Sequence, residues 1–313
     1  RALCQVAGMQ LRDVTNGTLG FKIAPRLNAA GRLDDMTVGV RCLVTENGDE
    51  ALELARQLDG LNRERRDIEA RMRSQAEELV DAEHMLEMEN PPYIVCLFRE
   101  DWHEGLVGLV ASRIKERCHR PVIAFAPSRS GVLKGSGRSV PGFNLRDALA
   151  HVAGTQPGLI ERFGGHAMAA GLTIRSGAFE SFQAAMELEA KARMNAEMLS
   201  GRIFTDGELQ PEDFTVEVAA ILREAGPWGQ GFPEPCFEGS FDIVKQRTVR
   251  DAHLKMTLKP VGGDCLLDGI AFNRKPGDWE VRARVRLVYR LEVNNFYRAP
   301  AVQLMVDHIE VAC

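Results

Sequence analysis

A proline-free, strongly helical stretch from Glu50 to about Met88 constrains the fold of this chain more than any other feature. Only Gly60 breaks its helical composition, and its apolar residues recur at steps of three, four or seven, which places them on one stripe. Such a helix would be roughly 55–60 Å long at about 1.5 Å per residue. Because the stripe is thin and residues 63–73 are charged nearly all round it, we expect a connector between two lobes. A coiled-coil dimer is the alternative, although the stripe covers few heptads.

The sequence after this helix predicts two different kinds of domain. We expect strands at 93–98, 121–126, 131–139 and 169–174, and helices at 104–118, 145–152 and 178–198. This alternation is typical of a three-layer α/β domain. After Gly201 the sequence changes to short alternating runs with glycine turns, which predict five or six strands. A small closed β-barrel of the OB type fits their number and size best.

Composition narrows the class of protein. Hydrophobic residues make up 45% and charged residues 27% of the chain, as in a soluble globular protein, and no apolar run is long enough for a membrane span. The start, RALCQVAGMQLRDV, lacks both the features of a signal peptide and an initiator Met, so we expect it to lie inside a longer protein. The seven cysteines are scattered without a C-x-x-C pair, which predicts no zinc site and favours a cytoplasmic location.

Four short motifs place side chains that can bind phosphate next to small residues. The first, FKIAPRLNAAGRL at 21–33, holds Asn28 between two arginines, the second of which is Arg32. The second, DWHEGLVGLVASRIKER at 101–117, has His103 at the expected start of a helix, where the helix dipole attracts anions. Taken alone, the first motif is also explained by surface arginines at the start of a helix, and a histidine at a helix start is more often a cap than a catalyst.

The other two motifs are rich in glycine. In LKGSGRSVPGFNLRDAL at 133–149, glycines such as Gly137 are expected to let the backbone turn tightly, which would expose N–H groups beside Ser136, Arg138 and Ser139. The spacing excludes a Walker A loop and a dinucleotide fingerprint. In RFGGHAMAAGL at 162–172, two glycines leave His166 on an open loop, where it could donate to phosphate or transfer a proton. A glycine-rich hairpin and a structural histidine are the alternatives.

In this order and at this spacing, the four motifs resemble the RecJ family of the DHH phosphoesterase superfamily. GPWGQGFPEPCFEG at 226–239 is similar to the family's join into its OB domain, so the resemblance covers nearly the whole chain. It implies a three-layer α/β DHH-associated domain joined to a long connector helix and a C-terminal OB-like β-barrel. The implied boundaries are 1–49 for the remnant of the DHH catalytic domain, 50–90 for the connector helix, 91–200 for the DHH-associated substrate-binding domain and 201–313 for the OB-fold nucleic-acid-binding domain.

The resemblance also implies a function and a set of site residues. It implies part of a 5′-to-3′ exonuclease that hydrolyses single-stranded DNA in repair and recombination, with Mg or Mn as the cofactor of the intact enzyme. The phosphate- and DNA-binding residues implied are Asn28, Arg32, His103, Ser136, Gly137, Arg138, Ser139, Gly164, Gly165 and His166. His166 is in addition a candidate auxiliary catalytic group. Single-stranded DNA is the expected partner, and a single-strand-binding protein is a further one by analogy.

The sequence departs from the family pattern in one respect. It contains no His-His pair and no Asp-x-Asp, and Asp34-Asp35 has no companion histidines. We therefore expect this chain to bind no metal and, by itself, to hydrolyse no DNA.

Cations and aromatic residues also mix in the expected barrel. The net charge is -5, yet Lys and Arg outnumber Asp and Glu between residues 243 and 300. This mixture is typical of sequence-indifferent single-strand binding. The predicted contacts are Arg247, Lys255, Arg284, Tyr289, Arg290 and Tyr297. Alternatively, Phe272 and Tyr289 belong to the core and the arginines only solubilise an edge strand.

Two other functions stay open at this point. One is a non-enzymatic nucleic-acid-binding or scaffold protein that retained the domains that bind the nucleic acid. The other is a smaller DHH relative that cleaves short oligoribonucleotides or cyclic dinucleotides, which the β-rich segment after residue 201 disfavours.

Overall fold

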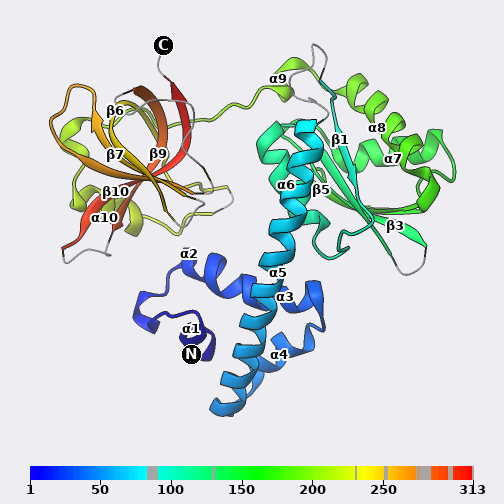
Figure 1. Cartoon of the computed structure of the whole chain (residues 1–313), viewed down its shortest axis with the longest axis horizontal. Coiled ribbons are helices and arrows are strands. Elements are labelled where there is room, and N and C mark those ends of the chain that lie inside the picture. Colours follow the sequence, from blue (N-terminus) through cyan, green and yellow to red (C-terminus); the bar gives the residue numbers. More distant parts are fainter. Residues whose placement is uncertain are drawn as a thin grey trace. The chain divides into compact units, whose positions relative to one another are not determined.

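The structure, a computed structural model, describes residues 1–82, 91–128, 131–229, 231–249, 253–272, 274, 283–294 and 299–311. It consists of two compact units, Arg1–Gly201 and Arg202–Cys313 (Figure 1). No helix in the described ranges is long and apolar enough to cross a membrane.

The long helix predicted from the sequence is α5 (Gly48–Ala82). Asn47 caps it, because its side-chain oxygen accepts hydrogen bonds from the N–H groups of Asp49 (3.0 Å) and Glu50 (3.2 Å). Its first half packs on α1 (Ala2–Val6), α3 (Ala24–Leu33) and α4 (Thr37–Val44). Its second half belongs to the core beneath the sheet (Figure 1). The apolar stripe of α5 thus packs into two hydrophobic cores, one with each half of the helix. This explains why so long a helix is stable with a narrow apolar stripe. The predicted end of the helix at 83–88 lies outside the described residues.

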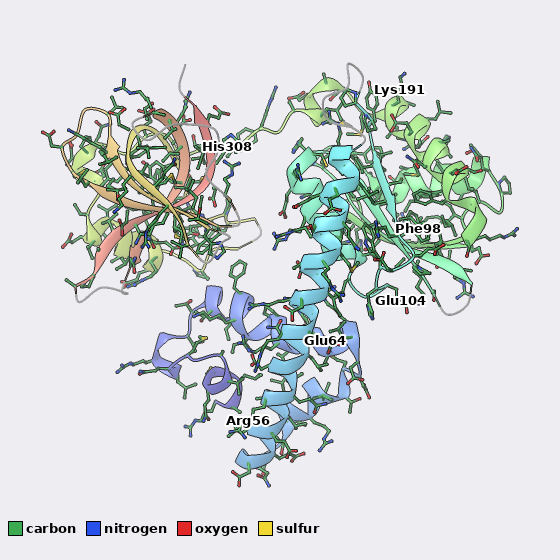
Figure 2. The ribbon with its side chains drawn as sticks, in the orientation of Figure 1. Arg56, Glu64, Phe98, Glu104, Lys191 and His308 are labelled. Carbon is green, nitrogen blue, oxygen red and sulfur yellow. The ribbon has the colours of Figure 1, made fainter. Side chains whose placement is uncertain are left out.

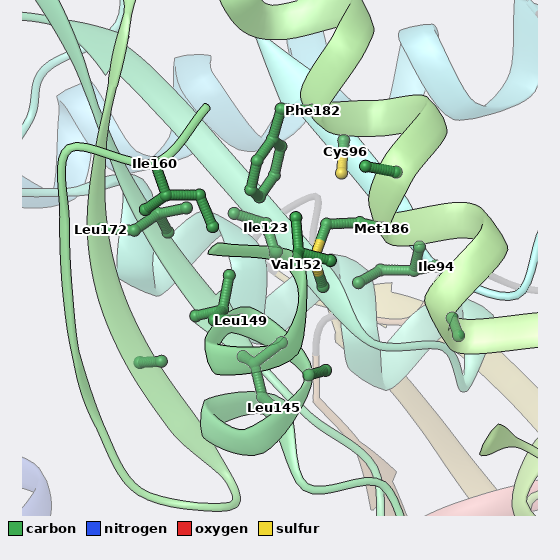
Figure 3. Close-up of a cluster of buried hydrophobic side chains, with 14 of the residues drawn as sticks. Ile94, Cys96, Ile123, Leu145, Leu149, Val152, Ile160, Leu172, Phe182 and Met186 are labelled. Atoms are coloured by element: carbon green, nitrogen blue, oxygen red, sulfur yellow. The ribbon is translucent and has the colours of Figure 1, made fainter. Parts of the chain in front are cut away.

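A five-stranded sheet with helices on both faces forms the rest of the first unit. Its order is β1-β2-β3-β5-β4, and the pairing between β1 and β2 is parallel while the others are antiparallel. The strands are β1 (Val95–Phe98), β2 (Val122–Pro127), β3 (Val132–Arg138), β4 (Arg162–Gly165) and β5 (Ala169–Arg175). Helix α6 (Val107–Cys118) and α5 cover one face. Helices α7 (Leu145–Thr155) and α8 (Phe179–Arg193) cover the other, around a core shown in Figure 3.

Short elements connect these parts. They are the 3-10 helix η1 (Leu11–Asp13), α2 (Asn16–Thr18), the π-helix η2 (Leu19–Ile23), the 3-10 helix η3 (Ser176–Ala178) and α9 (Ala196–Leu199). The helix predicted over 178–198 is divided, because Asn195 leaves the helical conformation and its side chain caps α9 by accepting from the N–H of Met198 at 3.0 Å.

The second unit is a closed barrel. In the described ranges its strand order is β10-β8-β7-β6-β9, and β8 and β10 pair in parallel. The strands are β6 (Phe237–Val249), β7 (His253–Pro260), β8 (Leu267–Ala271), β9 (Arg284–Asn294) and β10 (Ala301–Val311), preceded by the 3-10 helix η4 (Pro211–Asp213) and α10 (Val216–Glu224). Alternate residues of each strand fill one apolar core. The predicted fold class, an α/β domain with a long helix and an OB-like barrel, is confirmed.

Candidate nucleic-acid interface

Successive side chains of strand β3 point to opposite faces of the sheet. Lys134, Ser136 and Arg138 point to the face that α6 partly covers, while the residues between them point into the opposite core. A Cβ on Gly135 would lie 2.5 Å from Phe125 Cε1, and a Cβ on Gly137 would lie 2.5 Å from Leu145 Cδ2. The predicted tight turn with exposed N–H groups is therefore wrong. These glycines lie in a paired strand, where core side chains take the space that a larger residue would need.

Arg138 lies directly beneath α6. Its guanidinium donates hydrogen bonds to Ser136 Oγ (3.1 Å) and to the carbonyl oxygen of Gly137 (2.8 Å). A Cβ on Gly108 of α6 would lie 2.8 Å from Ser136 Oγ and 2.9 Å from Arg138 Nη2. Gly108 thus leaves the space in which this half-buried guanidinium lies. Sequence spacing alone does not predict that Gly108 lies against Ser136 and Arg138.

Arg32 approaches the same place from α3. Its guanidinium donates to the carbonyl oxygen of Gly105 at 3.1 Å, and a Cβ on Gly105 would lie 2.2 Å from the Arg32 carbonyl oxygen. His103 Nδ1 accepts from the N–H of Gly105 at 3.1 Å. His103 therefore stands in the turn before α6, which begins only at Val107, and not at the helix start that the sequence predicted.

The positive charges of Arg32 and Arg138 lie close enough to act on each other. Burial, and then the positive charge of Arg32, lower the pKa of Arg138. Among the residues that the structure describes, neither guanidinium has a carboxylate within ion-pair distance. Nearby Lys134, in contrast, pairs with Glu104 at 3.0 Å, and Glu104 is labelled in Figure 2. Two partly buried cations without a counter-ion favour an anionic ligand.

His166 lies close to Arg138 through the strand register. Arg138 pairs with Ala169 across β3 and β5, and the N–H of His166 donates to the Ala169 carbonyl oxygen at 2.8 Å. Adjacent strands are about 4.8 Å apart, so the Cα atoms of Arg138 and His166 are separated by about 10 Å. The segment before His166 is strand β4 rather than the predicted open loop, and His166 itself is exposed.

Bare backbone extends from Arg138 across the sheet. Gly171 of β5 pairs with Gly164 of β4, and a Cβ on Gly164 would meet nothing within 4 Å. Gly165 has φ +140°, and a Cβ there would lie 2.4 Å from the Ala169 carbonyl oxygen, so this turn requires glycine. Strand β4 is exposed along its whole length. The result is an exposed stretch of glycine backbone, with Gly171 paired to Ser136 on the strand that carries Arg138.

Two other predicted residues of this unit have different surroundings. Ser139 is 1% exposed and its hydroxyl donates to the carbonyl oxygen of Phe143 at 2.6 Å. The prediction that Ser139 binds phosphate is wrong, because its hydroxyl is buried and holds the turn before α7. Asn28 is exposed on α3, one helical turn before Arg32 and on the same side of the helix.

The residues of the barrel that were predicted to contact DNA differ in burial and in ion pairing. Tyr289 is fully buried in the barrel core, so its prediction as a DNA contact is wrong, and burial raises the pKa of its hydroxyl. Arg284 pairs with Asp242 at 3.0 Å, and Arg290 pairs with Asp307 and Glu234, both at 2.9 Å. Carboxylates therefore already neutralise these two guanidiniums.

The remaining predicted barrel residues lie on β6 and β7. Arg247 and Lys255 are paired opposite each other in the ladder between these strands. Tyr297 lies outside the described residues.

The described residues do not offer a metal site. No group of three His, Cys, Asp or Glu side chains that could hold a metal ion occurs among them. In the described part of the chain, the carboxylate oxygens that Mg²⁺ or Mn²⁺ would need are not gathered around Arg138 either, so no catalytic step is assigned to a metal on these residues.

Comparison with known proteins identifies both units. A DHHA1 domain model matches residues 90–192, and a RecJ OB domain model matches residues 205–308. The chain belongs to the RecJ family. It is 45% identical to the single-stranded-DNA-specific exonuclease RecJ of Escherichia coli, over 99% of this chain and 54% of that protein. The RecJ exonuclease of Haemophilus influenzae is 46% identical over the same shares, 99% and 54%.

A solved RecJ structure has the same fold. RecJ of Thermus thermophilus in complex with Mg²⁺ matches 99% of this chain and 46% of its own chain, with a TM-score of 0.77 and 26% identity. The chain spans about half the length of the curated RecJ relatives it matches, and it corresponds to their C-terminal part.

Proposed function

We propose that this chain is the DNA-holding part of a RecJ-type exonuclease that degrades single-stranded DNA in the 5′-to-3′ direction. The observation that carries the proposal is the Arg32–Arg138 pair. Its two guanidiniums are partly buried, lie beneath Gly105 and Gly108, and have no carboxylate partner among the described residues. The relatives named above are single-stranded-DNA-specific exonucleases.

In this proposal the first unit holds the terminal phosphate. Arg138 and Ser136 donate hydrogen bonds to its oxygens, Arg32 adds a second charge, and His166 donates from the neighbouring hairpin. The next nucleotide lies on the bare backbone of Gly164 and Gly171, where no side chain obstructs it. A metal centre outside this chain would activate the attacking water. The residues of this chain bind and orient the strand, and His166 is an auxiliary group.

The proposal also assigns a domain to each segment of the chain. Residues 1–49 are the tail of the DHH catalytic domain, 50–90 the connector, 91–200 the DHH-associated domain and 201–313 the OB domain. Mg²⁺ or Mn²⁺ is the cofactor of the intact enzyme, as solved RecJ structures contain both ions. A cytoplasmic setting, a role in DNA repair and recombination, and binding to a single-strand-binding protein are further parts of the proposal.

The Arg138→Ala substitution tests the phosphate site. We expect it to weaken binding of a 5′-phosphorylated single strand by about 1.5–3 kcal/mol, the usual effect of a lost charged hydrogen bond, and to affect a 5′-hydroxyl strand much less. Fluorescence anisotropy with the two otherwise identical strands measures the difference. Arg146→Ala is the matched control, because Arg146 is an exposed arginine of α7 on the opposite face of the sheet. Equal losses for both strands in Arg138→Ala would contradict the proposed phosphate site.

A further inference from the structure

The turn between β1 and α6 carries the backbone group that holds Arg32. Trp102 lies in this turn, is 3% exposed, and belongs to the core that α5 and α6 share with one face of the sheet. Three residues later, the Gly105 carbonyl oxygen accepts from the Arg32 guanidinium at 3.1 Å. The two backbones also touch, because a Cβ on Gly105 would overlap the Arg32 carbonyl oxygen. The place of Arg32 beside Arg138 therefore depends on where this turn lies.

Gln75 of α5 binds this turn at two points. Its side-chain oxygen accepts from the Trp102 indole N–H at 2.9 Å, and its side-chain nitrogen donates to Asp101 Oδ2 at 2.8 Å. Arg99 donates to the other carboxylate oxygen of Asp101 at 2.9 Å. An indole nitrogen can only donate, so the amide oxygen of Gln75 must face Trp102 and the amide nitrogen must face Asp101.

These two hydrogen bonds differ in what their loss would cost. The Asp101 carboxylate is 54% exposed and keeps Arg99 as a partner, so water can replace the Gln75 amide there with little effect. The Trp102 indole is buried, and a buried donor that loses its acceptor carries the full cost of its desolvation. Without Gln75, the turn must shift until the indole N–H reaches water, and Gly105 shifts with it.

We propose that Gln75 is a positioning residue of the phosphate site, which acts through Trp102 on Arg32. Its side-chain oxygen fixes the turn at Trp102. The turn presents the Gly105 carbonyl oxygen, which keeps the Arg32 guanidinium beside Arg138 for the 5′-phosphate of a single strand. Gln75 itself does not touch the phosphate. This inference rests on the proposed function, and it makes α5 a support of the phosphate site.

Gln75→Leu removes both hydrogen bonds of the side chain. We expect the affinity for a 5′-phosphorylated single strand to fall about 3- to 10-fold and the affinity for the 5′-hydroxyl strand to change much less, because only Arg32 is displaced. A merely structural defect would lower both affinities alike. Fluorescence anisotropy with the two strands used for Arg138→Ala measures the ratio. Gln57→Leu is the matched control, since Gln57 is an exposed glutamine of the same helix, and it should bind like the wild type.

A conservative variant tests the part played by Trp102. Gln75→Glu keeps an oxygen for the indole and loses only the exposed bond to Asp101. It should therefore retain the affinity of the wild type for the 5′-phosphorylated strand within about twofold. A loss as large as that of Gln75→Leu would contradict a role that runs through Trp102.

A double-mutant cycle tests the part played by Arg32. Gln75→Leu should add little to the loss caused by Arg32→Ala, because a residue that acts through Arg32 has no further effect once Arg32 is gone. Additive losses, or equal losses on both strands, would overturn the inference. So would wild-type binding by Gln75→Leu when Arg32→Ala and Arg138→Ala both lower the 5′-phosphate preference. If neither arginine substitution lowers that preference, the proposed phosphate site is itself wrong and the inference falls with it.

Discussion

At the residue scale, the candidate site depends on Arg32 and Arg138, which are partly buried and have no carboxylate partner among the residues that the structure describes. Charged groups are expensive to bury alone, so a half-buried guanidinium with only neutral partners is poised for an anion. The sequence predicted that Arg32 and Arg138 bind phosphate, but it could not pair them. Their proximity comes from the contact between the end of α3 and the turn at Gly105, which no local pattern encodes.

Side-chain orientation explains why Ser139 and Tyr289 are wrongly predicted to contact the nucleic acid. Both side chains have the right chemistry for a nucleic acid, and both follow strand patterns that fix their face only once the register is known. Ser139 lies where its hydroxyl turns inward to Phe143, and Tyr289 lies on the core side of β9.

Gly108→Ala is expected to separate binding from stability. A Cβ there would lie within 3 Å of Ser136 Oγ and Arg138 Nη2, so the guanidinium must shift and affinity for a 5′-phosphorylated strand should fall about tenfold or more. The stability should change little, since alanine favours a helix interior by about 1 kcal/mol over glycine and offsets the crowding. Anisotropy and urea unfolding measure the two effects.

The control for Gly108→Ala is Gly60→Ala in α5, where a Cβ would meet nothing within 4 Å. This variant should be up to about 1 kcal/mol more stable than the wild type and should bind DNA unchanged. Wild-type affinity in Gly108→Ala would show that Arg138 has no part in the phosphate site.

At the element scale, strand and helix types were largely predictable while their boundaries and faces were not. The run 131–139 was predicted as a strand, and it is β3. Its glycines nevertheless suggested a tight turn, because glycine signals turns in sequence and a glycine required by packing gives no different signal. The arginines of β9 were likewise interpreted without their partners, since cross-strand carboxylates on β6 are visible only when the strands are paired.

The Arg284→Ala, Arg286→Ala double variant is expected to leave the salt dependence of DNA binding unchanged. Both arginines are held by carboxylates of β6, so few phosphate contacts are lost with them. The cost in folding stability should be about 0–1 kcal/mol per pair, because these ion pairs are exposed. The slope of log affinity against log salt, compared with that of the wild-type chain, provides the measurement. A slope that flattens by about 0.7 per arginine would place the binding surface on β9 after all.

At the scale of the whole molecule, the order of motifs was more informative than any single motif. Each of the four motifs alone fitted an ordinary surface segment, hairpin or cap, yet all four lie on one unit, and residues of the other three lie near Arg138. Helix α5 was the most predictable element, since composition, periodicity and absence of proline all agreed. What the sequence could not supply was the distribution of charge on the barrel, which depends on the register of its strands.

The chain by itself is expected to release no nucleotides from single-stranded DNA. Hydrolysis in this family is expected to need two divalent ions held by carboxylate and histidine ligands, and the sequence lacks both a His-His pair and an Asp-x-Asp. In the function proposed above, the residues around Arg138 bind and orient a phosphate, and the described residues offer no group of three His, Cys, Asp or Glu side chains that could hold a metal ion. The measurement is incubation of 5′-labelled single strand with highly purified protein and Mg²⁺ or Mn²⁺, with full-length RecJ of Escherichia coli as the positive control. Mononucleotides released by the chain and abolished by a chelator would show that it holds a catalytic metal, and the division between binding and chemistry proposed above would then be wrong.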